Sequence, residues 1–340
     1  MSIHLRRTEE NLTEIEAAAR SLGRRVGLEG LLGRLNRQAA PAKVPGRAVD
    51  WGFQWNTSDQ SSERWFPQGV TTSADANRGG TVQGRRLLVA SWYSKTVDGH
   101  NQGSRVTVVD LDTLEYRHVL LVVPRTLPDG RVELAPLAVH AGGIVWCEDY
   151  LHVAGTRRGL FSFRMDDLIE LESTQHTFGY RFVLPVGFAY EADAVEGVEK
   201  MRYSFLSLDR GSDPPQLLAG EYGLGEMTRR LVRFPLDSES ALLAHEDGTS
   251  RPVWLDERGL GHMQGAAVVG ETYYVTSSRG RYRLGWMYVG TPGHFRSHPR
   301  ALPIGPEDIS YWPETDTFWS LSEYPGHRYV FSMRRSNLEA

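Results

Sequence analysis

Histidine and carboxylate side chains stand directly before apolar segments at three places in this 340-residue sequence. His140 begins HAGG, His262 begins HMQG, and Glu307 lies in GPED. Imidazole and carboxyl groups that face one substrate can act as general acid and base, and two imidazoles with one carboxylate can hold a divalent metal. His140, His262 and Glu307 are therefore the candidate catalytic set and the candidate metal ligands. A third interpretation stays open, in which these groups only hydrogen-bond to one another and to ordered water.

Only the fold can bring these residues together, and the sequence contains a repeat that would do so. Three kinds of short apolar segment recur five times in the same order, each rich in β-branched and aromatic residues and ended by Gly, Pro, Asp or Ser. The first kind occupies residues 69–75, 142–150, 204–210, 265–273 and 308–316. The second occupies residues 87–94, 151–159, 216–223, 272–280 and 317–326. The third occupies residues 106–114, 160–168, 231–237, 284–290 and 329–334.

A repeat of about 45 to 70 residues made of short strands is typical of radial blades. From residue 50 to about 335 the chain resembles the five-bladed β-propellers, which implies an all-β fold. In such a fold the first strand of every blade lines the central axis, so the starts of the five first strands converge. The ring must also close, and we expect VDWGFQW at 49–55 to complete the last blade.

The N-terminal segment has a different pattern. Apolar residues at helical spacing over 11–36 predict one or two amphipathic helices, with Asn11 and Glu14 in the relation of a capping box. We therefore expect a helical extension over residues 1–47 and a propeller domain over 48–340. The extension would pack across the propeller or pair with a second copy in a homodimer.

Alignment of the five first strands adds further candidates to the axial set. Gln68 and Gln264 occupy the same position as Glu307, and Asp308 follows it. These side chains predict a polar ring that binds substrate at one mouth of the channel. Aromatic residues near strand ends could form its walls, although tryptophans also fill the gaps between blades. The aromatic candidates are Trp51, Trp55, Trp65, Phe66, Trp92, Tyr93 and Trp312.

Composition narrows the classes of partner. A formal net charge of −4 gives no overall cationic field for nucleic acid. No apolar run is long enough for a secretory signal or a membrane-spanning helix, so we expect a cytoplasmic protein. The single cysteine, Cys147, lies in an apolar run and is expected to be a buried thiol.

Two function classes remain. The first is an enzyme that acts on a small, partly hydrophobic molecule by non-redox chemistry, such as isomerisation, elimination, cyclisation or hydrolysis, with acid/base or metal assistance. A glycosidase is less favoured, because that reaction needs two facing carboxylates and only the GPED segment offers acids at the aligned positions. The second class is a ligand-binding propeller without catalysis, either lectin-like or a platform for protein interaction.

Overall fold

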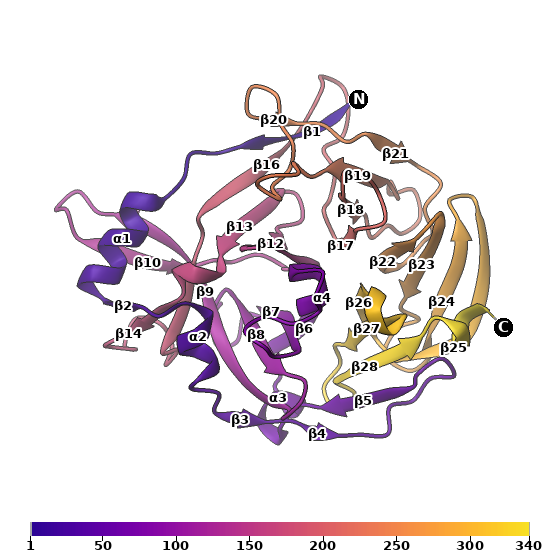
Figure 1. Ribbon diagram of the computed structural model, residues 1–340, viewed down its shortest axis with the longest axis horizontal. Helices are drawn as coiled ribbons and strands as arrows, with labels where there is room; N and C mark the ends of the chain where they lie inside the picture. The colour runs from indigo at the N-terminus through magenta and orange to yellow at the C-terminus, as the bar shows by residue number, and fades with distance from the viewer. Residues whose placement is uncertain (1, 340) are drawn as a thin grey trace.

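Short, mostly antiparallel β-sheets surround a common centre in the computed structural model, which describes residues 2–339 (Figure 1). The chain is about 49% strand and 10% helix, so the predicted all-β class and the propeller architecture are confirmed. Figure 1 looks along the centre and shows the inner ends of the sheets around α4 (Ser73–Ala76).

The strands of the described residues form five sheets. The largest contains β6 (Trp65–Thr72), β7 (Leu87–Ser94), β8 (Ser104–Asp110), β9 (Glu115–Thr126), β10 (Val132–Pro136), β14 (Ile169–Leu171) and β15 (Phe182–Pro185). The next contains β11 (Ile144–Cys147), β12 (Tyr150–Ala154), β13 (Leu160–Arg164), β16 (Phe188–Ala194) and β20 (Thr249–Ser250). A third consists of β17 (Phe205–Asp209), β18 (Gln216–Gly220), β19 (Leu231–Pro235) and β21 (Trp254–Asp256).

The last two sheets come from the C-terminal part of the chain. One consists of β22 (Met263–Val269), β23 (Thr272–Ser277), β24 (Leu284–Thr291) and β25 (His294–Ile304). The other contains β26 (Pro306–Trp312), β27 (Thr317–Ser322), β28 (Tyr329–Arg334) and β5 (Trp51–Gln54). Short helical turns occur at α3 (Thr57–Ser61), η1 (Met165–Asp167), η2 (Pro313–Thr315) and α5 (Ser336–Glu339). Each of the five strand triplets expected from the repeat is present as an antiparallel unit.

The innermost strands approach each other so closely that glycine is required at the contact. A Cβ atom on Gly265 of β22 would lie 2.7 Å from the Cα atom of Asp308 on β26. A Cβ atom on Gly143, directly before β11, would clash with the backbone of Leu206 on β17. The glycine at the start of these first strands therefore sets how near the axial side chains come to one another.

We expect Gly265→Ala to destabilise the protein, because the added methyl group meets backbone rather than a flexible side chain. Overpacking of this kind costs about 1–3 kcal/mol. The free energy of unfolding from denaturant titration measures the effect. Gly33→Ala is the matched control, since its Cβ atom would have only an ordinary contact, 3.7 Å from the carbonyl oxygen of Glu29. Equal stability of the two variants would contradict the close packing at Gly265.

The ring closes as expected from the sequence. Strand β5 pairs antiparallel with β28, with Val330 opposite Phe53 and Phe331 opposite Gly52. The last sheet therefore combines the beginning of the propeller with its end, and the prediction for residues 49–55 is confirmed.

The N-terminal segment runs around the outside of the sheets. It consists of β1 (Ile3–Arg7), α1 (Leu12–Ser21), β2 (Gly23–Arg25), α2 (Gly27–Leu32), β3 (Arg37–Gln38) and β4 (Ala40–Pro41). Its four strands pair in turn with β16, β14, β9 and β5, so the segment adds to three different sheets (Figure 1). Two short helices lie within the predicted range 11–36, and α1 packs its buried face on β9 and β10. The expected helical extension over residues 1–47 is not clearly present, because four strands that join the sheets share this segment.

The predicted capping box is wrong. The Asn11 side chain makes no cap hydrogen bond; its Nδ2 donates instead to the carbonyl oxygen of Val186 at 3.0 Å. The asparagine thus ties the start of α1 to the connection between β15 and β16. Cys147 is buried as expected, and burial raises the pKa of its thiol to about 12.

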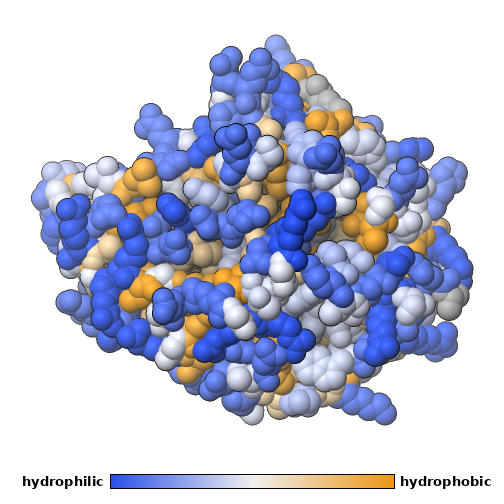
Figure 2. Space-filling model, in the orientation of Figure 1, coloured by the Kyte–Doolittle hydropathy of each residue, from blue (hydrophilic) through white to orange (hydrophobic). Residues whose placement is uncertain are grey.

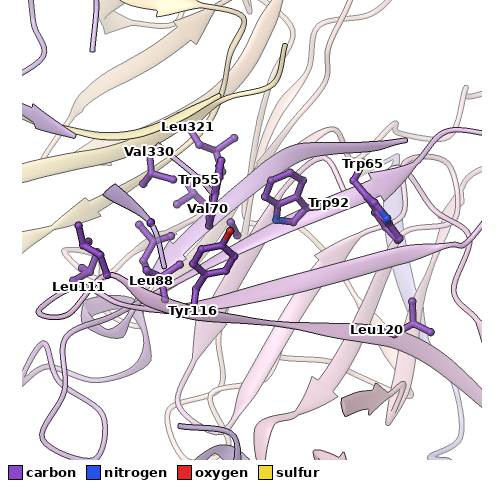
Figure 3. Close-up of a cluster of buried hydrophobic side chains, with 14 of the residues drawn as sticks. Trp55, Trp65, Val70, Leu88, Trp92, Leu111, Tyr116, Leu120, Leu321 and Val330 are labelled. Atoms are coloured by element: carbon purple, nitrogen blue, oxygen red, sulfur yellow. The ribbon is translucent and has the colours of Figure 1, made fainter. Parts of the chain in front are cut away.

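Large apolar side chains fill the spaces between the sheets, and polar ones cover the outside. In one core cluster Trp55 lies edge-on to Trp92 and to Tyr116, with ring centroids 5.0 and 5.2 Å apart (Figure 3). Figure 2 shows a largely hydrophilic face with small, separate hydrophobic areas. Among residues 2–339, no helix has the length and apolar character needed to cross a membrane.

Candidate functional site

Polar side chains from several sheets meet at the end of the axis where the first strands begin. Gln264 Nε2 donates to Glu307 Oε1 at 3.2 Å, and Gln68 Nε2 donates to Glu323 Oε2 at 3.3 Å. The two carboxyl groups interact, since the charge of Glu323 helps to raise the pKa of Glu307. We call this group the axial site: Gln68, Tyr93, His140, Tyr222, His262, Gln264, Glu307, Glu323 and Tyr324.

Glu307 is buried without a cation. Its side chain is 3% exposed, and Gln264 is the one side-chain hydrogen-bond donor to it in the described residues. Burial, and then the negative charges of Glu323 and Asp308, raises the pKa of Glu307 well above its ordinary value. The carboxyl group therefore tends to keep its proton.

Glu221 provides the contrast, because it is as deeply buried but fully compensated. Arg230 donates to both of its oxygens at 2.8 and 3.1 Å, and the backbone N–H of Arg202 donates to it at 3.0 Å. Burial alone would raise the pKa of Glu221, but these donors lower it. Glu221 is therefore part of a buried ion pair with Arg230, whereas no cation of the described residues compensates Glu307.

Two more carboxyl groups lie deeper along the axis. Asp308 Oδ2 accepts the backbone N–H groups of Val70 and Ile144, both at 3.3 Å, and so joins three neighbouring inner strands. Asp75 accepts the hydroxyl groups of Ser310 at 2.6 Å and Thr71 at 2.7 Å. Burial raises the pKa of both aspartates against the opposing effect of these donors. Asp308 thus links three inner strands beneath the axial site.

His140 reaches the axial site through Tyr93. The two rings are stacked with centroids 4.5 Å apart. Burial raises the pKa of Tyr93 to about 12, helped by the charges of Glu323 and Glu307, so this tyrosine lies close to both acids. Part of His140 is open to solvent, while burial of its ring lowers the pKa of the imidazole. A neutral imidazole that is partly open to solvent can accept a proton.

His262 approaches from the other side through Tyr222. Their ring centroids are 6.0 Å apart in an edge-on arrangement. Burial, and then the charges of Glu307 and Glu323, raises the pKa of Tyr222. The backbone of His262 has a φ of 63°, a left-handed conformation that is uncommon for a residue with a side chain. His140 and His262 therefore each contact a different tyrosine of the axial site.

Cations lie at the rim of the axial site. Lys95 Nζ is 3.5 Å from the centre of the Phe66 ring, and Arg281 lies over the Tyr324 ring at 5.2 Å. The charges of Lys95 and Arg281 help to oppose the rise that burial causes in the pKa of Glu323. Glu323 is therefore the more easily ionised of the two glutamates.

The predicted metal set is not assembled. Nowhere in residues 2–339 do three or more His, Cys, Asp or Glu side chains form a group that could hold a metal ion. His140, His262 and Glu307 belong to one region but do not converge on a point at ligand distance.

The aromatic candidates are placed in three different environments. Phe66 and Tyr93 lie at the axial site, with their ring centroids 5.7 Å apart. Trp55 and Trp92 are buried in the core between sheets (Figure 3). Trp312, at the opposite end of β26 from Glu307, lines an outer cavity of 290 Å³ with Trp51, and Trp65 lines another cavity described below. Of the aromatic candidates, only Phe66 and Tyr93 lie at the end of the axis where Glu307 and Glu323 are found.

No protein-family model and no curated protein matches the chain. Among solved structures it is similar to a GH43_1 enzyme from Xanthomonas citri, with a TM-score of 0.41 and 10% identity over 94% of this chain and 92% of that one. It is also similar to a gluconolactonase from Xanthomonas campestris, with a TM-score of 0.38 and 13% identity over 89% of each chain. The β-propeller domain of Cps50 (Swd1) from Myceliophteria thermophila gives a TM-score of 0.38 and 9% identity over 88% of this chain and 99% of that one. Similarity at this level assigns no reaction to the chain.

Three residues of the axial site were not predicted from the sequence. Glu323, Tyr222 and Tyr324 follow second strands rather than first strands. A signal for them exists in the repeat, because Tyr93, Tyr222 and Tyr324 occupy the same position in WYS, EYG and EYP. The ends of the second strands therefore reach the same mouth as the starts of the first.

Proposed function

We propose that the chain is an enzyme that acts on a small molecule at the axial site by non-redox acid/base chemistry. The observation that carries the proposal is the buried, cation-free Glu307 beside a second glutamate. Native proteins bury a carboxyl group in this way at a cost in stability, and such groups concentrate at functional sites.

The two glutamates can divide the work of proton transfer. Glu307 and Glu323 titrate as a coupled pair, so one holds a proton under conditions in which the other is ionised. Glu307 then acts as general acid, and Glu323, nearer to Lys95 and Arg281, acts as general base. The amide groups of Gln68 and Gln264 hold the two carboxyl groups in orientation. His140 relays protons between the site and solvent.

The surrounding tyrosines favour a flat or partly hydrophobic substrate. Tyr93, Tyr222 and Tyr324 each keep a partly exposed ring, which offers apolar faces and a hydroxyl group. Burial and the neighbouring acids raise the pKa of all three, so each hydroxyl stays protonated and can donate to a substrate oxygen. Isomerisation, elimination, cyclisation and hydrolysis all fit such a site.

A search for turnover in a mixture of small metabolites tests the proposal. The full-length protein is incubated with the mixture, and mass spectrometry follows compounds that disappear and appear. We expect a product with the wild type and at least a tenfold slower reaction with His140→Gln, since general acid–base groups contribute about 10²–10⁴-fold. His294→Gln, a change of an exposed histidine on β25, is the control. A compound that binds and stays unchanged would favour the non-catalytic, ligand-binding alternative.

We also infer that each of the five sheets is one blade. The inferred order is supported by contacts between neighbouring inner strands, which run from β6 to β11, β17, β22 and β26 and back to β6. In this arrangement residues 48–340 form the propeller, and residues 1–47 form an outer extension that could also pair with a second copy.

A further inference from the structure

A polar cavity lies between the largest sheet and the N-terminal segment. Its volume is 350 Å³, which is enough for a small molecule. Its charged lining consists of Arg37, Asp59, Arg105, Arg117 and Arg181, four cations against one anion. Buried Arg328 separates it from the axial site, donating to the carbonyl oxygens of Asp59 and Glu323, both at 2.7 Å.

The one anion of the lining is already neutralised by protein groups. Asp59 accepts the Tyr116 hydroxyl at 2.6 Å, His118 Nε2 at 3.0 Å, Arg105 at 3.0 Å and Arg37 at 3.2 Å. Burial alone would raise the pKa of Asp59, but these donors lower it below its ordinary value. Because these donors already compensate the charge of Asp59, it does not neutralise Arg117 or Arg181.

Arg105 is a deeply buried cation with an unused donor. Its side chain is sandwiched between the rings of Trp65 and Trp92, 4.5 and 4.6 Å from the guanidinium carbon. One Nη donates to Asp59 and the other to the Tyr180 hydroxyl at 3.0 Å, while Nε has no partner in the described residues. The guanidinium is thus held rigidly at the wall of the cavity.

Arg117 has no carboxylate partner within ion-pair distance in residues 2–339. It donates to the carbonyl oxygen of Arg34 at 2.5 Å and lies over the Phe182 ring at 4.4 Å. Burial, and then the charges of Arg181, Arg34 and Arg37, lowers the pKa of Arg117. Glu170 compensates part of this cluster through Arg181, at 3.4 Å, and through Arg24 and Arg34. A positive excess remains at the cavity.

The histidine of this cavity does not serve proton transfer. Thr107 Oγ1 lies 2.7 Å from His118 Nδ1, and Asp59 lies 3.0 Å from Nε2, so both ring nitrogens are occupied. Burial, and then the Arg105 charge, lowers the pKa of His118 to about 3, which keeps the imidazole neutral. The cavity therefore offers groups that can bind a ligand, but its histidine is not available for proton transfer.

The geometry points to a binding site for a small molecule that carries a phosphate group and a ring. Guanidinium groups bind phosphate through charge-assisted hydrogen bonds, and a group with two negative charges matches the positive excess of the lining. Trp65, Tyr180 and Phe178 provide the apolar side. Phe178 is 44% exposed and has a φ of 53°, so a large ring of the cavity lining is held in a costly backbone conformation. This inference is independent of the proposed reaction at the axial site.

Calorimetric titration with phenyl phosphate, inorganic phosphate, benzoate and phenol tests the site on the full-length protein. We expect phenyl phosphate to bind most tightly, inorganic phosphate and benzoate more weakly, and phenol least. Arg117→Gln should weaken phenyl phosphate binding at least about tenfold, the effect of losing one charged hydrogen bond. Arg131→Gln, which removes an exposed arginine paired with Asp129, is the matched control and should change nothing.

A second variant keeps the test decisive if Arg117→Gln fails to fold. Phe178→Ala changes an exposed side chain and should weaken phenyl phosphate but leave inorganic phosphate unaffected. Tight binding of inorganic phosphate alone would overturn the ring component, and equal affinity for benzoate and phenyl phosphate would overturn the phosphate class. Equal affinity for phenol, or no effect of either variant, would overturn the site.

Discussion

Replacement of Glu307 by glutamine is expected to slow the reaction at the axial site by about 100- to 10,000-fold, the usual contribution of a general acid or base. Glutamine keeps the size of the side chain and its contact with Gln264 but cannot transfer a proton. The assay is the rate of product formation in the metabolite mixture. Glu314→Gln, at the other end of the same sheet in η2 and exposed, is the matched control and should retain the wild-type rate.

The same variant is expected to be at least as stable as the wild type at neutral pH. The folded-state pKa of Glu307 is raised, so its contribution to stability is present below the ordinary pKa of about 4.5 and is lost as the pH rises through the folded-state pKa. Because glutamine does not ionise, Glu307→Gln does not lose stability as the pH rises. A variant that loses both stability and turnover at pH 7 would indicate that Glu307 is structural.

Asp59→Asn is expected to lower the free energy of unfolding by about 3 kcal/mol, because it leaves the buried charge of Arg105 without its partner. Asn is nearly the same size, so the effect reports charge rather than lost volume. Denaturant titration at pH 7 measures it. Asp112→Asn provides the control, since Asp112 is 51% exposed and its pair with Arg86 lies at the surface.

The pH dependence of the free energy of unfolding tests the same cluster around Asp59 and His118. The folded-state pKa of Asp59 is lowered, so its stabilising effect is present above the ordinary pKa of about 3.8 and is lost as the pH falls below it. His118 acts in the same direction at higher pH, because the unfolded chain takes up a proton below about pH 6.5 and the folded chain does so only near pH 3. Asp59→Asn should remove the steep loss below pH 4. An unchanged acid-unfolding curve would contradict the assignment.

The sequence predicted the strand triplets because every triplet repeats a local pattern of apolar residues and turn residues. The same alignment brought Gln68, Gln264 and Glu307 to one end of the axis, where their side chains or immediate neighbours are found. The reason is geometric: strands of one kind begin at one face of the ring. Their roles in a reaction stay predictions until turnover is measured.

The partners of these side chains could not be predicted. Glu323 contacts Gln68 across 255 residues of sequence, and only the closed ring makes them neighbours. The tryptophans could not be assigned for a similar reason. The sequence around Trp55 and Trp92 did not distinguish a binding site from the core, and both side chains fill the core. Of the Asp59 cavity, the sequence offered only Trp65, because the lining residues come from α3, β3, β6, β8 and β9 and share no repeat position.

Pairing of β5 with β28 has a consequence for synthesis of the protein. Residues 51–54 leave the ribosome long before residues 329–334, so the edge of β5 that faces β28 stays unpaired until those residues have been translated, while β4 can pair with its other edge early. The sheets between them can form locally as they emerge, whereas this last pairing joins the most distant parts of the ring and is slow for that reason. Until it forms, this edge of β5 stays open, and open strand edges are places where chains can aggregate.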